Sequence, residues 1–127
     1  MTNTDLHYLG LVEISKLIQS RQLSPVEVTQ AELDRIARLD GALKSYSTVV
    51  GEAALAQAHA AEKEIASGKV RGPLHGVPVA VKDLCWMKDT PTSHGMTILR
   101  DNRPKEDGTV VARLREAGAI ILGKLQQ

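Results

Sequence analysis

Two short and almost purely apolar runs in the second half of the chain restrict its possible folds most strongly. Residues 77–81 are Val-Pro-Val-Ala-Val, residues 119–122 are Ala-Ile-Ile-Leu, and a glycine directly precedes each run. Runs of this length are typical of strands that are buried in a sheet. Between them, apolar residues at helical spacing in 108–117 predict a helix. We therefore expect a right-handed unit of strand, crossover helix and parallel strand, with Pro78 at the start of its strand or on a sheet edge.

Regular patterns earlier in the chain predict helices and one further strand. Apolar residues in 6–21 recur at spacings of three and four, which indicates an amphipathic helix. Ser24 followed by Pro25 is typical of the start of a second helix, so a helical hairpin is expected. The predicted apolar stripe of this second helix consists of Val26, Leu33, Ile36 and Ala37. Residues 46–50 are suited to a short strand, and seven alanines in 52–66 favour another helix.

The chain is predicted to form part of one α/β domain. Its 127 residues are enough for one core and too few for two ordinary domains. We expect N-terminal helices packed on part of a mixed sheet, with 1–70 as the helical region and 71–127 as a strand-loop-helix-strand unit. The stretch 85–105 predicts a long irregular loop, a feature that is usually functional in compact domains. Asp107 is the candidate cap of the helix that follows.

Composition argues against several classes of partner. The chain has 16 basic and 15 acidic residues, a net charge of +1 and no long run of like charges, so neither a phosphate backbone nor an anionic lipid surface is expected to bind. Tyr8, Tyr46 and Trp86 are too few for base stacking. No apolar stretch reaches the ~18 residues of a membrane span, and no secretory signal is expected. The single Cys85 fits a reducing cytosol, so a cytoplasmic protein is predicted.

Metal and nucleotide sites are not expected either. Paired metal-ligand spacing is missing among the four histidines, His7, His59, His75 and His94. The stretch 118–124 has the glycines and lysine of a phosphate-binding loop, but Leu125 stands where Mg²⁺ needs a hydroxyl. The four residues between its glycines are also strand-like rather than flexible. We therefore predict a protein without a cofactor.

Lys82 is the strongest candidate for a catalytic side chain. It follows the apolar run directly and would lie at the carboxyl end of a strand, where open α/β sheets place their sites. Partial removal from water favours a neutral amine, which can accept a proton from a hydroxyl. Strand alternation directs Asp83 to the opposite face, so it is not expected to pair with Lys82. From residue types alone, a structural lysine that reaches out to water would be the commoner explanation.

A resemblance to a known family favours the catalytic interpretation. Residues 72–83, Gly-Pro-Leu-His-Gly-Val-Pro-Val-Ala-Val-Lys-Asp, resemble the segment of amidase-signature enzymes that holds their catalytic lysine. Further similarity is found in residues 23–28, in Thr90-Pro-Thr, at Gly95 and in residues 106–124. The resemblance covers nearly the whole chain in the family's order, so residues 1–127 are identified as the N-terminal portion of a single amidase-signature domain.

The resemblance implies a triad of a serine nucleophile, a bridging serine with a cis peptide bond, and a lysine, here Lys82. The lysine takes a proton through the bridging serine, the nucleophile attacks an amide carbonyl, and water releases the acid from the acyl-enzyme. None of the seven serines in this chain has a glycine-rich setting, so both serines are expected beyond residue 127. The prediction is an amidase that converts a small amide to an acid and ammonia or an amine, with this fragment inactive alone.

The loop at 84–96 departs from the family pattern, because relatives often have small residues near His94 and Met96. We expect these groups and Trp86 to pack under the loop rather than to narrow an acyl pocket. Cys85 lacks an adjacent activating histidine and is expected to be buried and unreactive. Two alternatives remain: an amidotransferase subunit that passes ammonia to a partner, and a non-catalytic module that forms homo-oligomers through its N-terminal helices.

Overall fold

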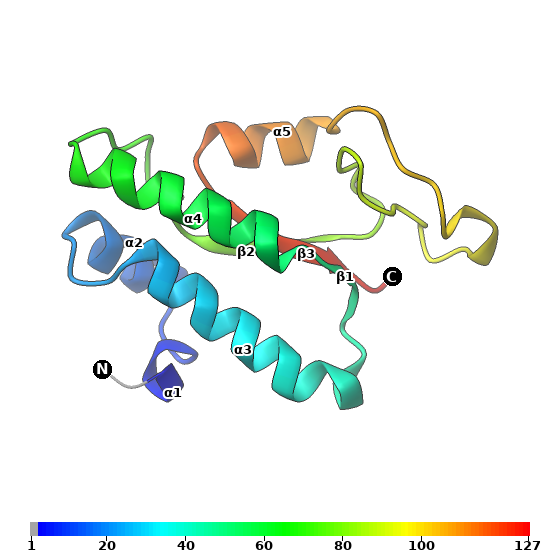
Figure 1. The fold of residues 1–127 in the computed structure, drawn as a ribbon, viewed down its shortest axis with the longest axis horizontal. Helices are drawn as coiled ribbons and strands as arrows, with labels where there is room; N and C mark the ends of the chain where they lie inside the picture. Colours follow the sequence, from blue (N-terminus) through cyan, green and yellow to red (C-terminus); the bar gives the residue numbers. More distant parts are fainter. Residues whose placement is uncertain (1–2) are drawn as a thin grey trace.

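A computed structural model describes residues 3–127 and shows a mixed α/β fold (Figure 1). The elements in chain order are α1 (Asn3–Leu6), α2 (Leu11–Gln19), α3 (Pro25–Leu43), β1 (Tyr46–Val49), α4 (Gly51–Ala66), β2 (Pro78–Lys82), the 3₁₀ turn η1 (Thr97–Leu99), α5 (Thr109–Glu116) and β3 (Ile120–Leu125). The sheet order is β1-β3-β2, with β3 antiparallel to β1 and parallel to β2. The predicted class of helices packed on a mixed sheet is confirmed, as is the parallel pairing of the two apolar strands.

The central strand β3 carries the core on both of its faces. Ile120 and Leu122 pack against alanines of α4, whereas Ile121 packs against Val111 of α5 on the opposite face. The small alanine side chains let α4 lie close to the sheet. Gly123 allows a similarly close approach of β1, because a Cβ there would lie 2.2 Å from the carbonyl oxygen of Thr48. The long helices α3 and α4 therefore cover one face of the sheet, and α5 covers the other (Figure 1).

Strand β2 lies at an edge of the sheet, and this position corrects one expectation. Pro78 is its first residue, as predicted for a residue that cannot donate a ladder hydrogen bond. Burial on both faces was expected for this apolar run, but only its two end residues, Val77 and Val81, are buried and the three residues between them are half-buried. The prediction was wrong because the run 77–81 is flanked by a neighbouring strand on one side only.

The N-terminal helices begin and end differently from the predicted pattern. The helix expected over 6–21 is shorter than predicted: α1 ends at Leu6, and α2 covers only Leu11–Gln19, because the backbone N–H of Gly10 bonds to Glu13 and caps the start of α2. Ser24 caps α3 as predicted, since its Oγ accepts the backbone N–H groups of Val26 and Glu27. Of the predicted stripe, Ala37 is exposed. The main partner of α3 is α4 rather than α2, so the hairpin of the first two predicted helices is not the principal packing unit.

Helix α5 also differs in detail. Gly108 occupies the N-cap position and no side chain caps the helix. The carboxylate of Asp107 instead accepts the backbone N–H of Lys88 at 2.8 Å and Nε of Arg115 at 2.9 Å. Val110, expected on the apolar face, is 58% exposed. Asp107 thus holds the long loop that precedes α5 rather than the start of the helix.

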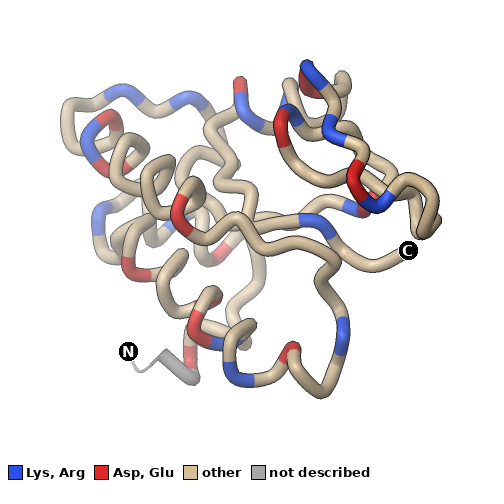
Figure 2. The backbone as a smooth tube through the Cα atoms, turned by 45° about the vertical axis from the view of Figure 1, so that its right-hand side comes forward, with Lys and Arg blue, Asp and Glu red and all other residues tan. Residues whose placement is uncertain are grey.

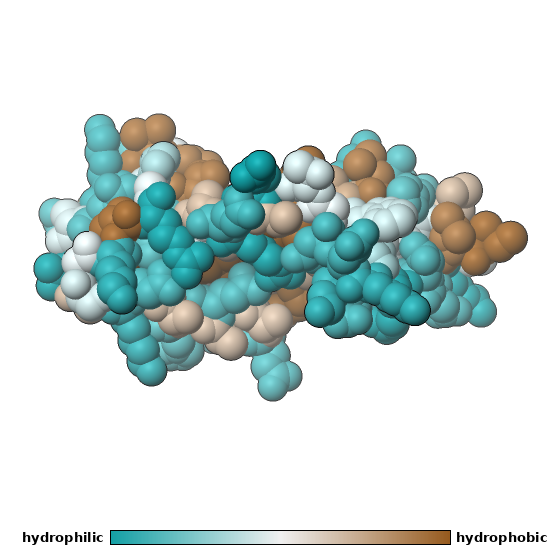
Figure 3. Space-filling model, turned by 90° about the horizontal axis from the view of Figure 1, so that it is seen from above, coloured by the Kyte–Doolittle hydropathy of each residue, from teal (hydrophilic) through white to brown (hydrophobic). Residues whose placement is uncertain are grey.

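Acidic and basic residues are interspersed along the chain, and no element carries charge of one sign alone over a long stretch (Figure 2). No helix within residues 3–127 is both long enough and apolar enough to cross a bilayer. Exposed apolar side chains lie at the right-hand end of the view in Figure 3, on the side where Figure 1 shows the long loop, and others lie at the upper left of the same view. Met96 and Ile98 of this loop are 48% and 88% exposed.

Candidate active site at the end of strand β2

Lys82 is the last residue of β2 and therefore lies at the carboxyl end of the parallel strands, as predicted. Its side chain is exposed, and no residue in the described range 3–127 forms a hydrogen bond or ion pair with its Nζ. The expectation that the Lys82 amine is partly withdrawn from water is therefore wrong for residues 3–127. The amine is exposed because Lys82 lies at the end of an edge strand. The catalytic role of Lys82 stays a prediction.

Asp83 lies on the face of β2 opposite to Lys82 and is 2% exposed. Its Oδ2 accepts hydrogen bonds from the backbone N–H of Ser93 at 3.1 Å and from the Ser93 hydroxyl. Its Oδ1 lies 3.4 Å from Nζ of Lys124. The prediction that Asp83 does not pair with Lys82 is consistent with these contacts, because the carboxylate is committed to other partners.

Lys124 is fully buried in β3, and sequence reasoning missed its importance. Its Nζ donates a hydrogen bond to Oγ1 of Thr92 at 2.8 Å, in addition to the ion pair with Asp83. In the sequence, Lys124 was noted only as part of residues 118–124, which do not form a phosphate-binding loop. A lysine inside an apolar strand could have predicted a buried ion pair, because a buried ammonium requires a charged partner. Val81 pairs with Lys124 in the ladder, which brings the neighbouring Asp83 within reach.

Burial and charge act in opposite directions on the two groups of this pair. Burial raises the pKa of Asp83, but the hydrogen bonds from Ser93 and the charge of Lys124 outweigh it and leave the pKa below its usual value. Burial lowers the pKa of Lys124, and the carboxylate of Asp83 partly opposes that effect. Each charge therefore favours the charged form of the other.

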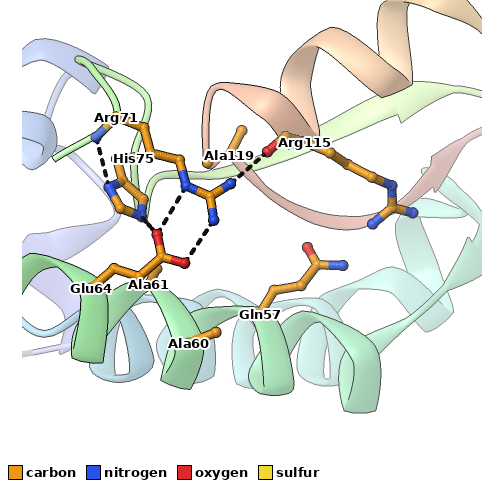
Figure 4. A pocket seen from close by; sticks show the side chains of 9 residues that line it. Gln57, Ala60, Ala61, Glu64, Arg71, His75, Arg115 and Ala119 are labelled. Carbon is orange, nitrogen blue, oxygen red and sulfur yellow. Dashed lines mark hydrogen bonds and ion pairs between the residues drawn. The ribbon is translucent and has the colours of Figure 1, made fainter. Parts of the chain in front are cut away.

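A second polar cluster lies at the opposite, amino-terminal end of β2 and β3 (Figure 4). His75 is 1% exposed; its Nδ1 accepts the backbone N–H of Arg71 at 3.1 Å, and its Nε2 lies 3.1 Å from Glu64. Burial lowers the pKa of His75, although the charge of Glu64 opposes this. Arg71 forms two hydrogen bonds with Glu64, and the cluster borders a cavity of about 190 Å³. Its polar groups pair with one another, which indicates a structural role.

The loop after Asp83 corrects the expected packing of its bulky residues. Met87 is buried, but Trp86 and Met96 are each 48% exposed. Neither of these two side chains is therefore packed under the loop as expected. Cys85 is half-buried rather than buried. Within residues 3–127, no group of three His, Cys, Asp or Glu side chains could hold a metal ion.

Comparison with known proteins gives the family. The sequence profile of the amidase family matches residues 27–127. The chain is 58% identical over 117 residues to AmiD of Mycobacterium tuberculosis, which is named as an amidase; the match covers 92% of this chain and 25% of AmiD. It is 46% identical over 121 residues to one of the subunits of the glutamyl-tRNA(Gln) amidotransferase of Salinispora tropica, covering 95% of this chain and 25% of that protein.

The solved structures agree with the sequence matches. The peptide amidase of Stenotrophomonas maltophilia superimposes with a TM-score of 0.86 at 35% identity, over 93% of this chain and 24% of the peptide amidase. The chain therefore belongs to the amidase-signature family of amide hydrolases, which act on carbon–nitrogen bonds. It spans about a quarter of the length of the relatives that it matches.

Proposed function

We propose that this chain supplies the lysine of a serine-dependent amidase, with Lys82 as the general base. The observation that carries the proposal is the position of Lys82 at the carboxyl end of β2, within the 72–83 segment of a chain that belongs to the amidase family. The two serines of the proposed Ser-cisSer-Lys triad would come from sequence outside these residues. The substrate would be a small carboxylic amide.

The proposed reaction needs a neutral amine on Lys82. Its Nζ takes the proton of the bridging serine while that serine takes the proton of the nucleophile, whose oxygen then forms a bond to the amide carbon. Collapse of the tetrahedral intermediate breaks the carbon–nitrogen bond, and the proton leaves with ammonia or the amine. Water, deprotonated along the same path, then attacks the acyl-enzyme and releases the acid. Because Lys82 is exposed here, the segment that bears the serines would also have to cover it and exclude water.

An amidotransferase component is the second candidate. The 46% identity to a glutamyl-tRNA(Gln) amidotransferase protein favours it, although the identity to AmiD is higher. In that case the ammonia would pass to a partner protein instead of leaving into solution. Glutamine hydrolysis that requires a partner would support the amidotransferase, and hydrolysis of simple amides without one would support the amidase.

A cytoplasmic location and self-association remain proposals as well. The lone Cys85 fits a reducing compartment.

The exposed side chains of Tyr8, Leu11 and Val12 offer an apolar surface near the start of the chain. This surface could form a homo-oligomer, or serve the alternative of a non-catalytic association module. Sizing by light scattering tests this: a monomer with amidase activity would exclude the association module.

The amidase proposal is tested by ammonia release from simple amides, using the full-length protein that carries these residues. Lys82→Ala should lower kcat at least ~10²-fold, as expected for the loss of a general base. Lys88→Ala is the matched control, because Lys88 is also an exposed lysine near the end of β2 and should be dispensable. Retention of wild-type kcat by Lys82→Ala would overturn the proposal.

A further inference from the structure

We infer that the buried ion pair between Asp83 and Lys124 aims the Lys82 side chain, which makes Asp83 and Lys124 positioning residues for the reaction. The inference rests on the proposed function of Lys82. Lys82 lies between two buried neighbours, Val81 at 6% and Asp83 at 2% exposure. Its own amine has no partner within residues 3–127, so nothing at the tip of the side chain fixes its direction. The direction therefore depends on how the backbone at the end of β2 is held.

Main-chain hydrogen bonds hold only part of that backbone. The N–H of Asp83 donates to the carbonyl of Leu125 at 2.9 Å and joins the end of β2 to the end of β3. The carbonyl of Lys82 accepts the N–H of Cys85 at 2.9 Å, which starts the turn into the long loop. Beyond these contacts the chain leaves the sheet, and the ends of strands are the places where a ladder opens most readily.

The side chain of Asp83 supplies the remaining connections. Its two oxygens contact two other segments: Oδ2 accepts hydrogen bonds from Ser93 in the loop, and Oδ1, which accepts no hydrogen bond within residues 3–127, forms an ion pair with Nζ of Lys124 in β3 at 3.4 Å. Lys124 in turn donates to Thr92, which lies in the same loop and is also fully buried. One carboxylate and one ammonium thus connect β2, β3 and the loop at a single point, one residue from Lys82.

Stability alone is a weak explanation for this arrangement. Removing two charges from water is costly, and replacing a buried ion pair with apolar groups of similar size is often neutral or stabilising. What a hydrogen-bonded carboxylate provides is a fixed geometry, because its bonds are directional. A general base requires such a geometry, since a misplacement of about 1 Å in an active site can cost about 10²-fold in rate.

The test compares Asp83→Asn, Lys124→Met and the double variant in the full-length amidase. Each single variant should lower kcat by at least ~10-fold with KM changed less than ~2-fold, because the base is misplaced while substrate binding is kept. The acid limbs of their kcat/KM–pH profiles should also separate. Lys124→Met leaves the Asp83 anion, which favours protonation nearby and moves the limb to higher pH. Asp83→Asn removes that anion and also the carboxylate that opposes loss of the Lys124 proton, so its limb should not move to higher pH. A unit charge on the order of 10 Å from a titrating group corresponds to about 0.3 to 1 pH unit. The double variant should lack the movement to higher pH.

Glu64→Gln is the matched control for a general loss of stability. It disrupts the His75 cluster at the opposite end of β2 and should lower thermal stability while kcat is kept. Asp83→Glu keeps the charge and should recover part of the activity and the wild-type pH profile. If Asp83→Asn does not fold, Ser93→Ala removes one donor to Asp83 and should still lower kcat about 3-fold or more.

Three results would overturn the inference. These are wild-type kcat in Asp83→Asn, pH profiles that do not separate between the single variants, and an activity loss in Glu64→Gln as large as in Asp83→Asn. The proposed function fails separately, through an inactive wild type or an active Lys82→Ala variant. A wild type that depends on Lys82 but not on Asp83 would reject only the positioning role.

Discussion

Gly118, between α5 and β3, gives a prediction whose magnitude follows from two features of the structure. Its φ of +80° lies in the left-handed region, and a Cβ there would lie 2.4 Å from Cδ2 of His75. Alanine at this position therefore incurs backbone strain of about 1–2 kcal/mol and overpacking against a buried ring of about 1–3 kcal/mol. We expect Gly118→Ala to lower the free energy of unfolding by about 2–5 kcal/mol.

Gly68 provides the control that separates the two contributions. Its φ is +87°, but a Cβ there would have nothing within 4 Å, so Gly68→Ala should cost only the strain of about 1–2 kcal/mol. Urea denaturation followed by circular dichroism measures both variants against the wild type. Equal losses of stability for Gly118→Ala and Gly68→Ala would show that the His75 ring does not pack against Gly118 as described.

Two further predictions concern pH and helix capping. Burial lowers the pKa of His75 in the folded chain, so below about pH 6.5 the unfolded chain binds a proton that the folded chain resists. The free energy of unfolding should therefore fall as the pH drops from 7.5 to 5.5. His75→Gln should flatten this pH dependence, whereas the control His59→Gln, at an exposed histidine, should not. An unchanged slope in His75→Gln would contradict His75 as its source. Ser24→Ala removes the side chain that accepts two N–H groups at the start of α3 and should cost about 1 kcal/mol in the same denaturation experiment. A Ser24→Ala variant as stable as the wild type would show that the cap contributes nothing.

Local sequence signals were sufficient for elements that depend on neighbouring residues. The Ser24 cap, the alanine-rich helix α4 and the position of Pro78 at the start of a strand all follow from short-range physical chemistry. The order of the strands did not follow. A run of five apolar residues indicates a strand, but it does not reveal whether that strand is central or at an edge, and β2 is one of the two edge strands of this sheet.

The polar contacts of Lys124 could not be predicted from the sequence either, because they depend on how the strands pair. The ladder between β2 and β3 changes register between the pairs at Val79 and Val81. This shift places Lys124 beside the end of β2 and within reach of Asp83. Simple alternation along β3 does not anticipate an irregularity of this kind. The motif around Lys82 was found through resemblance to a family, whereas its exposure depended on tertiary neighbours.

The role of an amine at position 82 can be measured by chemical replacement. In a Cys85→Ala background, Lys82→Cys should be inactive toward amides, and alkylation with 2-bromoethylamine should restore an amine at nearly the same distance from the backbone. The sulfur in the new side chain makes that amine less basic, so ammonia release should return with the acid limb of kcat/KM moved to lower pH. Failure of the alkylated protein to regain activity, or recovery with an unmoved acid limb, would contradict Lys82 as the general base.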